Sequence, residues 1–366
     1  LEEPATYTYA VMGGEAEQWQ EAMEAEMRTL HSNNTYTLEK TPPGTRVLPT
    51  KWVFKKKVGA AGEVKYKARL VAKGFAQQEG VDYNEVYAPT GKHTTLRTLI
   101  SKVAAEDWEL HQLDITTAFL NGPLEEDVWV AQPEGYQQLG QEVSCHLHKA
   151  LYGLKQAPRA WYTALKGALE ELGWKAGESD SALFTRESAG ELVVLLVYVD
   201  DILVAARSLE EVQRAKGELL ERFAGRDMGE AGVYLGIEIG RNRAAGTITL
   251  SQRTNAAALV DRFGMDAAKS RSTPLDPGTK LSKVGPAMEW DGGGKNPYAE
   301  LGGSLLYLSN CTRPDLAHAT SQLARFMAAP TQQHWGAAKG VLRYVAGTLN
   351  VGIMYGKGSS KLVGYG

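Results

Sequence analysis

The chain has 366 residues, 43% of them apolar and 23% charged, which predicts a globular protein of about two to three domains. A formal net charge of −3 gives no sign of a nucleic-acid binder in the chain as a whole, and the two widely spaced cysteines, Cys145 and Cys311, exclude a disulfide scaffold and a Cys-rich zinc module. The longest strongly apolar stretch, Leu192–Val199, has eight residues, so the sequence predicts neither a membrane span nor a secretory signal.

The first predicted elements are a helix and a β-hairpin. Apolar residues at helical spacing predict a helix over Gln18–Leu30. Two β-like runs follow, Val47–Val58 and Val64–Gly74, joined across Gly59-Ala60-Ala61-Gly62. Strand alternation places basic residues on one side of the second run and residues that can pack on the other. The basic side carries Lys65, Lys67, Arg69 and Lys73.

Basic residues are concentrated in this hairpin. Eight of them lie between Lys51 and Lys73 and are opposed only by Glu63, so the segment has a net charge of +7. A local cluster of this kind can bind a polyanion even when the whole chain is slightly acidic. The alternative interpretation is a solvated, lysine-rich surface hairpin without a ligand.

The remaining elements are helices mixed with short strands. Helical spacing is found in Thr94–Ala105, Pro158–Leu172, Glu210–Phe223, Asn255–Phe263, Ser304–Met327 and His334–Val345. Strand-like runs end at Asp114 and cover Leu192–Val199, Ile202–Ala206, Val233–Ile239 and Thr247–Ser251. A mixture of helices and short antiparallel strands predicts an α+β fold.

Acidic residues interrupt two segments that are otherwise apolar. Asp114 lies within Leu110–Gly122, and Asp200 and Asp201 lie between two apolar strands. Carboxylates at strand ends are unfavourable unless something compensates their charge. Mg²⁺ can do so, and three carboxylates from two strands could hold two ions about 3.5–4 Å apart, an arrangement used in phosphoryl-type transfer. The alternative is that Asp200-Asp201 is an ordinary hairpin turn.

Several short motifs occur in a fixed order along nearly the whole chain. They are Lys51-Trp52-Val53-Phe54-Lys55, Tyr66–Phe75, Asp82–Pro89, Leu113–Gly122, Leu151–Trp161, the YVDD of Tyr198–Asp201, Tyr234–Ile239, Thr312–Leu316 and Leu342–Thr348. By these blocks the chain resembles the reverse transcriptase of copia-type LTR retrotransposons. A lone YxDD is weak evidence, whereas so many collinear blocks are specific.

The resemblance implies an α+β right-hand polymerase with fingers, a palm built on an antiparallel sheet, and a small thumb. The implied boundaries are an N-terminal lead-in over residues 1–46, fingers and palm over 47–240, a thumb over 241–294 and a connection-like segment over 295–366. Copia-type chains continue past a Gly-Tyr like Gly364-Tyr365 into a ribonuclease H domain, whereas this sequence begins with Leu1 and stops at Gly366. We therefore expect the polymerase segment of a Gag-Pol-type polyprotein.

The resemblance also implies site residues. Asp114, Asp200 and Asp201 match the metal-binding catalytic triad, in which Asp201 contributes less to coordination. Phe119 matches the aromatic steric gate beneath the sugar, and the alternative for it is a core phenylalanine. Implied nucleotide contacts are Lys67, Arg69, Lys73, Gln156 and Pro158, and the implied primer grip is Tyr234, Leu235 and Gly236.

The implied activity is template-primed DNA synthesis from dNTPs, with RNA or DNA as template, which copies retrotransposon RNA into cDNA. The implied cofactors are two Mg²⁺ ions, with Mn²⁺ as a substitute. Implied partners are the RNA template, a DNA or RNA primer, and the ribonuclease H and integrase regions of the parent polyprotein; no membrane partner is expected, and a dimer is left open. The implied location is a cytoplasmic virus-like particle, or the nucleus together with the integration complex.

Two alternatives accompany this interpretation. The first is a catalytically decayed or domesticated copy that binds RNA without making DNA, which the intact carboxylates argue against. The second is a segment that folds only beside its ribonuclease H or a partner subunit.

The remaining candidate ligands are interpreted as structural. His146 and His148 would share one face of a strand, as zinc ligands can, but no further residue completes a site, so we expect ordinary polar residues. Both cysteines are expected to be small core residues.

Overall fold

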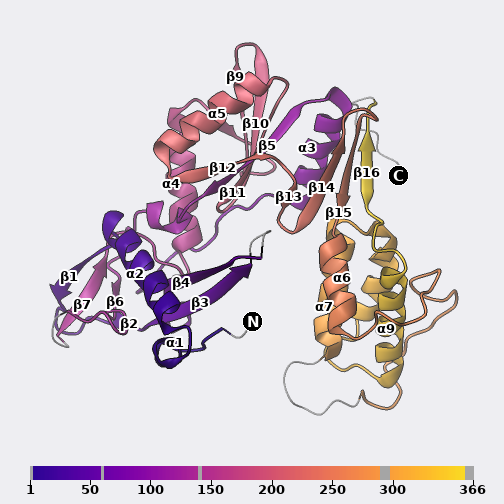
Figure 1. Cartoon of the computed structure of the whole chain (residues 1–366), viewed down its shortest axis with the longest axis horizontal. Helices are drawn as coiled ribbons and strands as arrows, with labels where there is room; N and C mark the ends of the chain where they lie inside the picture. The colour runs from indigo at the N-terminus through magenta and orange to yellow at the C-terminus, as the bar shows by residue number, and fades with distance from the viewer. Residues whose placement is uncertain (1–2, 59–61, 139–141, 289–296, 359–366) are drawn as a thin grey trace. The chain divides into compact units, whose positions relative to one another are not determined.

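The structure is a computed structural model that describes residues 3–58, 62–138, 142–288 and 297–358 (Figure 1). By its internal contacts the chain divides into two compact units. Unit 1 comprises Leu1–Gly91, Leu113–Val204 and Gln213–Asp227, and unit 2 comprises Lys92–Gln112, Ala205–Val212 and Met228–Gly366. No helix among the described residues combines the length and the apolar character needed to cross a membrane.

Most helices and strands lie wholly within one or the other of the two units. Those of unit 1 are α1 (Tyr7–Met12), α2 (Ala16–Ser32), β1 (Tyr36–Lys40), β2 (Val47–Leu48), β3 (Thr50–Val58), β4 (Val64–Ala72), η1 (Gly74–Ala76), η2 (Ala118–Asn121), β6 (Trp129–Val130), β7 (Val143–Leu147), α4 (Ala157–Glu171), β8 (Lys175–Ala176), β9 (Leu183–Ser188) and β10 (Glu191–Tyr198). Those of unit 2 are α3 (His93–Glu106), β13 (Val233–Tyr234), β14 (Ile237–Asn242), β15 (Thr247–Ser251), α6 (Arg253–Arg262), α7 (Pro297–Cys311), η3 (Pro314–Leu316), α8 (Ala317–Ala324), α9 (Gln332–Ala346) and β16 (Ile353–Gly356). Four elements carry residues of both: β5 (Glu109–Ile115), β11 (Asp201–Ala206), α5 (Leu209–Arg222) and β12 (Gly225–Glu230).

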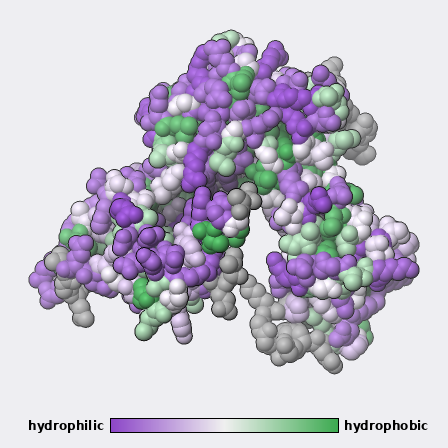
Figure 2. Space-filling view, viewed as in Figure 1, coloured by the Kyte–Doolittle hydropathy of each residue, from purple (hydrophilic) through white to green (hydrophobic). Residues whose placement is uncertain are grey.

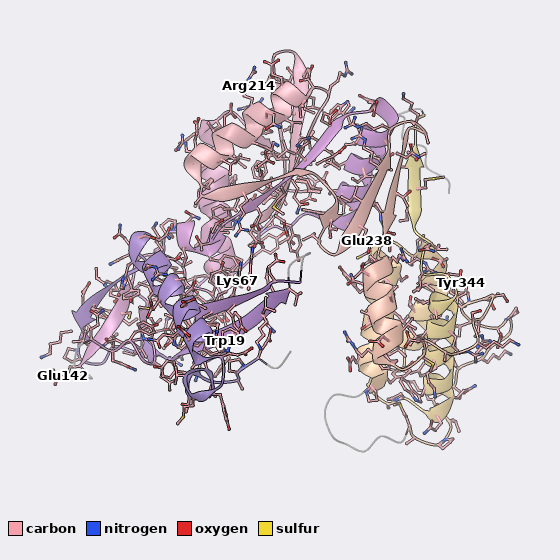
Figure 3. The ribbon with its side chains drawn as sticks, viewed as in Figure 1. Trp19, Lys67, Glu142, Arg214, Glu238 and Tyr344 are labelled. Atoms are coloured by element: carbon pink, nitrogen blue, oxygen red, sulfur yellow. The ribbon has the colours of Figure 1, made fainter. Side chains whose placement is uncertain are left out.

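Helix α2 packs along the β3–β4 hairpin, as Figure 1 shows. Its apolar stripe is buried and includes Trp19, whose indole meets the rings of Phe54 at 5.2 Å and Tyr66 at 4.8 Å, both edge to face. The predicted helix over Gln18–Leu30 is therefore confirmed. Figure 3 labels Trp19 and, on the hairpin, Lys67.

The β3–β4 hairpin has one cationic face. Its antiparallel register pairs Lys55 with Lys67, and cross-strand partners point to the same side. That face carries Lys51, Lys55, Lys57, Lys65, Lys67 and Arg69. Lys56 points to the other side and forms an ion pair with Glu15 at 2.6 Å. Residues 59–61 of the predicted connecting turn lie outside the described residues.

A six-stranded sheet has the order β12-β5-β11-β10-β9-β8. The end of β5 is held against the turn between β10 and β11 because the backbone N–H of Ile115 donates to the carbonyl oxygen of Asp200 at 2.8 Å. Helix α4 starts with Pro158 in its first turn, where the missing N–H costs nothing, and buries Trp161, Leu165 and Leu169.

Unit 2 combines the four-stranded sheet β13-β14-β15-β16 with helices α6 to α9, which share an apolar core. The predicted single helix over Ser304–Met327 is wrong, because α7 ends at Cys311 and α8 starts at Ala317. Pro314 lacks a backbone N–H and disfavours a helical conformation at Arg313, so the chain turns there.

Helices and antiparallel strands are thus combined throughout, and the predicted α+β class is confirmed. Hydrophilic residues cover most of the face seen in Figure 2, which agrees with the burial of the apolar side chains in internal cores. The predicted fingers, palm, thumb and connection boundaries stay predictions.

Candidate active site

Unit 1 contains a polar pocket of about 440 Å³. Its walls come from α2, the β3–β4 hairpin, the end of β5, the segment before α4, the β10–β11 turn and β12. The charged residues of the walls are Glu26, Lys57, Lys67, Arg69, Asp114, Asp200 and Arg226. We call this cavity the acidic–basic pocket, since both kinds of charge meet there.

Two of the predicted catalytic carboxylates, Asp114 and Asp200, lie on the wall of this pocket. Asp200 occupies the turn between β10 and β11, directly after Val199, which has a positive φ of 56°. The carbonyl oxygen of Val199 accepts a hydrogen bond from the indole Nε1 of Trp161 at 2.7 Å. The tip of the hairpin is therefore held by α4 on one side and by Ile115 of β5 on the other.

Without a bound cation, the negative charges of Asp114 and Asp200 repel each other. Burial raises the pKa of Asp200, and the negative charge of Asp114 raises that pKa further, whereas Arg69 and Lys57 lower it. Neither carboxylate forms an ion pair within the described part of the chain. A bound cation would supply the missing compensation.

The donor set fits a hard divalent cation, because Mg²⁺ is commonly bound by one or two carboxylates together with water and substrate phosphate oxygens. Asp201 does not lie on the pocket wall. Over residues 3–58, 62–138, 142–288 and 297–358, no group of three or more His, Cys, Asp or Glu side chains is arranged to hold a metal ion. The structure thus brings together two members of the predicted triad.

Lys67 and Arg69, two of the three predicted basic nucleotide contacts, line the pocket, and Lys73 does not. Burial lowers the pKa of Lys67, and the nearby positive charges of Lys57, Arg69 and Arg226 lower it further. A bound anion would reduce the repulsion between these positive charges. The sequence marks Lys57 only as one member of the basic run. No sequence pattern marks Arg226 as a candidate ligand, because it stands alone next to Asp227.

Phe119, the predicted steric gate, is half-buried and packs against the core of unit 1. It does not line the pocket, whereas Tyr152 does. The two rings meet edge to face, with centroids 5.0 Å apart. Tyr152 is a further residue that the sequence reasoning missed, although it lies within the quoted block Leu151–Trp161.

Gln156 and Pro158 lie away from the pocket wall. Gln156 is only 2% exposed: its Oε1 accepts from Nε2 of Gln77 at 2.9 Å, and its Nε2 donates to the carbonyl oxygen of Asp82 at 2.9 Å. Pro158 belongs to the first turn of α4. Their predicted nucleotide contacts stay predictions.

The predicted primer-grip residues form the turn between β13 and β14 in unit 2. Tyr234 is buried, and both Leu235 and Gly236 have positive φ. The carbonyl oxygen of Leu235 accepts from the hydroxyl of Tyr307 at 2.8 Å, and that of Gly236 accepts from Nδ2 of Asn255 at 3.0 Å. The turn is therefore anchored to α6 and α7.

The two cysteines agree with their expected role, whereas the interpretation of His146 and His148 as ordinary polar residues stays a prediction. His146 stacks on Trp129 with ring centroids 4.4 Å apart, and its Nε2 lies 2.8 Å from Oδ1 of Asp127. Cys145 and Cys311 are both buried and free, as expected for small core residues.

Comparison with known proteins gives a consistent set of relatives. A family model described as "Reverse transcriptase (RNA-dependent DNA polymerase)" matches residues 33–277. The chain is 41% identical over 369 residues to the retrovirus-related Pol polyprotein from transposon TNT 1-94 of Nicotiana tabacum, covering 99% of this chain and 28% of the relative. It is 38% identical over 361 residues to the retrovirus-related Pol polyprotein from transposon RE1 of Arabidopsis thaliana, covering 98% of this chain and 24% of the relative.

The chain therefore spans about a quarter of the length of these curated relatives, 28% and 24%. Among solved structures, a foamy viral protease-reverse transcriptase in complex with double-stranded DNA is similar, with a TM-score of 0.43 and 9% sequence identity. That match covers 90% of this chain and 48% of the viral one.

Proposed function

Because the chain belongs to the reverse transcriptase family of RNA-dependent DNA polymerases, we propose that it extends primers with dNTPs on RNA and DNA templates. The family match and the plant relatives confirm the predicted membership of copia-type retrotransposon reverse transcriptases. The observation that carries the proposed activity is the placement of Asp114 and Asp200 in one pocket with Lys67, Arg69 and Arg226.

Asp114 and Asp200 are the residues that would hold divalent metal. When bound there, Mg²⁺, or Mn²⁺ in its place, would lower the pKa of the primer 3′-hydroxyl and would stabilise the negative charge of the leaving pyrophosphate. The two carboxylates set where the reacting phosphorus must lie. Asp201 is adjacent in the chain, and we assign it a supporting role because it is not on the pocket wall.

The basic residues of the pocket would bind the triphosphate. Lys67 and Arg69 come from β4 and Arg226 from β12, so cations from two separate elements face the same cavity. A guanidinium can bind two phosphate oxygens at once, while a lysine acts as a point charge. Together they would neutralise a substrate that carries several negative charges.

The proposed function also implies a division of the chain into polymerase subdomains. The β3–β4 hairpin would belong to the fingers and the six-stranded sheet to the palm, within residues 47–240. The thumb would cover 241–294 and the connection-like segment 295–366. The partners would be template, primer and dNTPs, together with the ribonuclease H and integrase regions of a longer Pol polyprotein.

Primer extension on a homopolymeric RNA template, with and without Mg²⁺, tests the proposal. We expect extension that depends on the metal and is lost in Asp200→Asn. The control is Glu142→Gln, which removes an exposed carboxylate that pairs with Lys40 on the β1–β7 sheet, outside the pocket. A chain that binds the RNA primer–template but never extends it would instead be a decayed copy.

A further inference from the structure

Strand β12 carries Arg226 to the acidic–basic pocket and starts beside the end of β5. The carbonyl oxygen of Ala224 accepts from the backbone N–H of Thr116 at 2.8 Å. A Cβ at Gly225 would lie 2.9 Å from the carbonyl oxygen of Asp114, so a glycine lets the strand start this close to that residue. Arg226 follows directly and lines the pocket together with Asp114.

Apolar burial does not decide which face of β12 meets the pocket. The strand lies at the edge of the six-stranded sheet. None of its six residues, Gly225–Glu230, is buried, and Met228 is 55% exposed. Register is weakly specified in a strand without a buried apolar face, and a slip by one residue exchanges its two faces. Another interaction must therefore turn Arg226 towards the pocket.

A buried lysine of α5 meets the next residue of β12. Lys216 is 1% exposed, and its Nζ lies 2.6 Å from Oδ2 of Asp227. Successive side chains of a strand point to opposite sides, so Asp227 faces α5 while Arg226 faces the pocket. Lys216 does not line the pocket, and the proposed chemistry gives it no role.

The charges of these residues make the alternative register of β12 unfavourable. A slip by one residue would turn Arg226 towards α5, where its positive charge would meet that of Lys216. It would also turn Asp227 into the pocket, where its carboxylate would join those of Asp114 and Asp200. Removing the partner of a buried charge is strongly unfavourable. The pair of Lys216 and Asp227 therefore favours the register in which Arg226 faces the pocket.

We propose that Lys216 is a positioning residue of the nucleotide site, whose ion pair with Asp227 holds β12 in the register that presents Arg226 to the triphosphate of a dNTP. This inference rests on the proposed polymerase function, because Arg226 acts there as a phosphate contact. Lys216 lies outside the pocket and acts through Arg226. Its loss should therefore weaken dNTP binding only as far as Arg226 contributes to that binding.

The test is a double-mutant cycle on the KM for dNTP in primer extension. Arg226→Gln removes the phosphate contact, Lys216→Met removes the buried charge and keeps a side chain of similar length, and a third protein carries both changes. We expect KM to rise by about tenfold in Arg226→Gln and by about three- to tenfold in Lys216→Met, with kcat within about twofold of normal. The double variant should have a KM no higher than Arg226→Gln alone.

Two further variants separate positioning from a structural role. Asp227→Asn removes the other partner of the ion pair and should also raise KM, so a folding defect in one variant, seen by circular dichroism, leaves the other to decide. Arg186→Met is the matched control, because Arg186 pairs with Glu218 of the same helix α5 at 2.8 Å and does not line the pocket. It should lower the midpoint of urea unfolding and leave KM unchanged.

If Lys216 only stabilised the fold, Lys216→Met would reduce the fraction of active enzyme, measured by the burst amplitude, and leave KM normal. A normal KM in both Lys216→Met and Asp227→Asn overturns the inference, while primer extension by the unmodified chain keeps the proposed function. So does a double variant whose KM exceeds that of Arg226→Gln by the full effect of Lys216→Met. A normal KM in Arg226→Gln also overturns the inference, since Lys216 would then position no phosphate contact. An unmodified chain that extends no primer overturns both.

Discussion

The indole Nε1 of Trp161 donates a hydrogen bond to the carbonyl oxygen of Val199 at 2.7 Å, which ties α4 to the residue that precedes Asp200. Val199 has a φ of +56°, a left-handed conformation that is strained for a β-branched residue. Strain of this kind, about 1–3 kcal/mol, persists only where the surroundings hold it. Trp161 is 1% exposed and so provides a fixed donor.

Trp161→Phe should therefore slow catalysis, because it removes a hydrogen bond that holds the β10–β11 turn carrying Asp200. The variant keeps the edge-to-face contact with Phe223 but leaves the Val199 carbonyl without its donor, which should lower the free energy of unfolding by about 1–3 kcal/mol. We expect kcat to fall while the KM for dNTP stays unchanged. The matched control is Trp108→Phe, which removes another buried indole donor, the one to Glu106 at 3.0 Å in unit 2. Equal losses of kcat in both variants would contradict the assigned role.

Asp114→Asn and Asp200→Asn should each reduce the rate of primer extension by about a thousandfold or more. The fold should survive, since Asp200 and Asp114 repel each other in the pocket and either change removes that repulsion. Asp201→Asn should cost less, because Asp201 is not on the pocket wall. Single-turnover extension at saturating dNTP measures all three, and near-normal rates in either of the first two variants would refute the assignment.

The basic residues on the pocket wall should bind the nucleotide, whereas a neighbouring basic residue outside the pocket should not. Lys67→Gln, Arg69→Gln and Arg226→Gln each remove a charge from the pocket wall and should raise the KM for dNTP by about tenfold. Lys73→Gln is the matched control, since Lys73 belongs to the same basic run but does not line the pocket. The salt dependence of primer–template binding is measured in parallel. If that dependence changes while the KM for dNTP does not, these residues contact the nucleic acid instead.

Trp19→Ala should destabilise the chain by about 3–5 kcal/mol, the usual cost of removing a buried tryptophan. Trp19 is 2% exposed and joins α2 to Phe54 and Tyr66 of the hairpin. Urea unfolding followed by circular dichroism measures the change. Tyr9→Ala, at a residue 71% exposed on α1, is the control that should cost little. Equal midpoints for the two variants would mean that α2 contributes little to the stability of the hairpin.

Alkaline pH should weaken the fold through Cys145. Burial raises the pKa of its thiol from 9.0 to about 12. Between these values the unfolded chain releases the thiol proton and the folded chain keeps it, so the free energy of unfolding falls as pH rises from 9 towards 12. Cys145→Ala removes this contribution and should show a shallower decline of unfolding free energy between about pH 8 and pH 10.5. Identical slopes in the two proteins would contradict the prediction.

The features that sequence reasoning placed correctly depend on local pattern. Gln18–Leu30 was predicted from the spacing of apolar residues, and Asp114 and Asp200 from the interruption of apolar strands. In both cases the residues that form the pattern lie within a dozen positions of the helix or carboxylate that the pattern predicts. Pro314 marks the break between α7 and α8 locally, but apolar residues keep helical spacing on both sides of it, and that spacing predicts a single helix.

Residues that reach the pocket through long-range packing could not be predicted in this way. Tyr152 reaches it because Gly153 lets its segment approach Ala72, eighty residues earlier in the chain. Arg226 reaches it because β12 pairs with β5. No sequence pattern marks Arg226, and the block Leu151–Trp161 does not show that Tyr152 reaches a cavity, since strand pairing decides which side chains share one.

Helix α2 has a practical consequence for work on this protein. The family match begins at residue 33, directly after α2 ends at Ser32. Yet α2 contributes Glu26 to the pocket wall, where its carboxylate accepts from the backbone N–H of Leu70 at 3.2 Å. A polypeptide trimmed to residues 33–277 would expose the outer edge of β4 and the aromatic rings of the hairpin to solvent. Exposed edges and rings of this kind favour aggregation. The shortest fragment worth purifying for enzymology thus begins before Ala16.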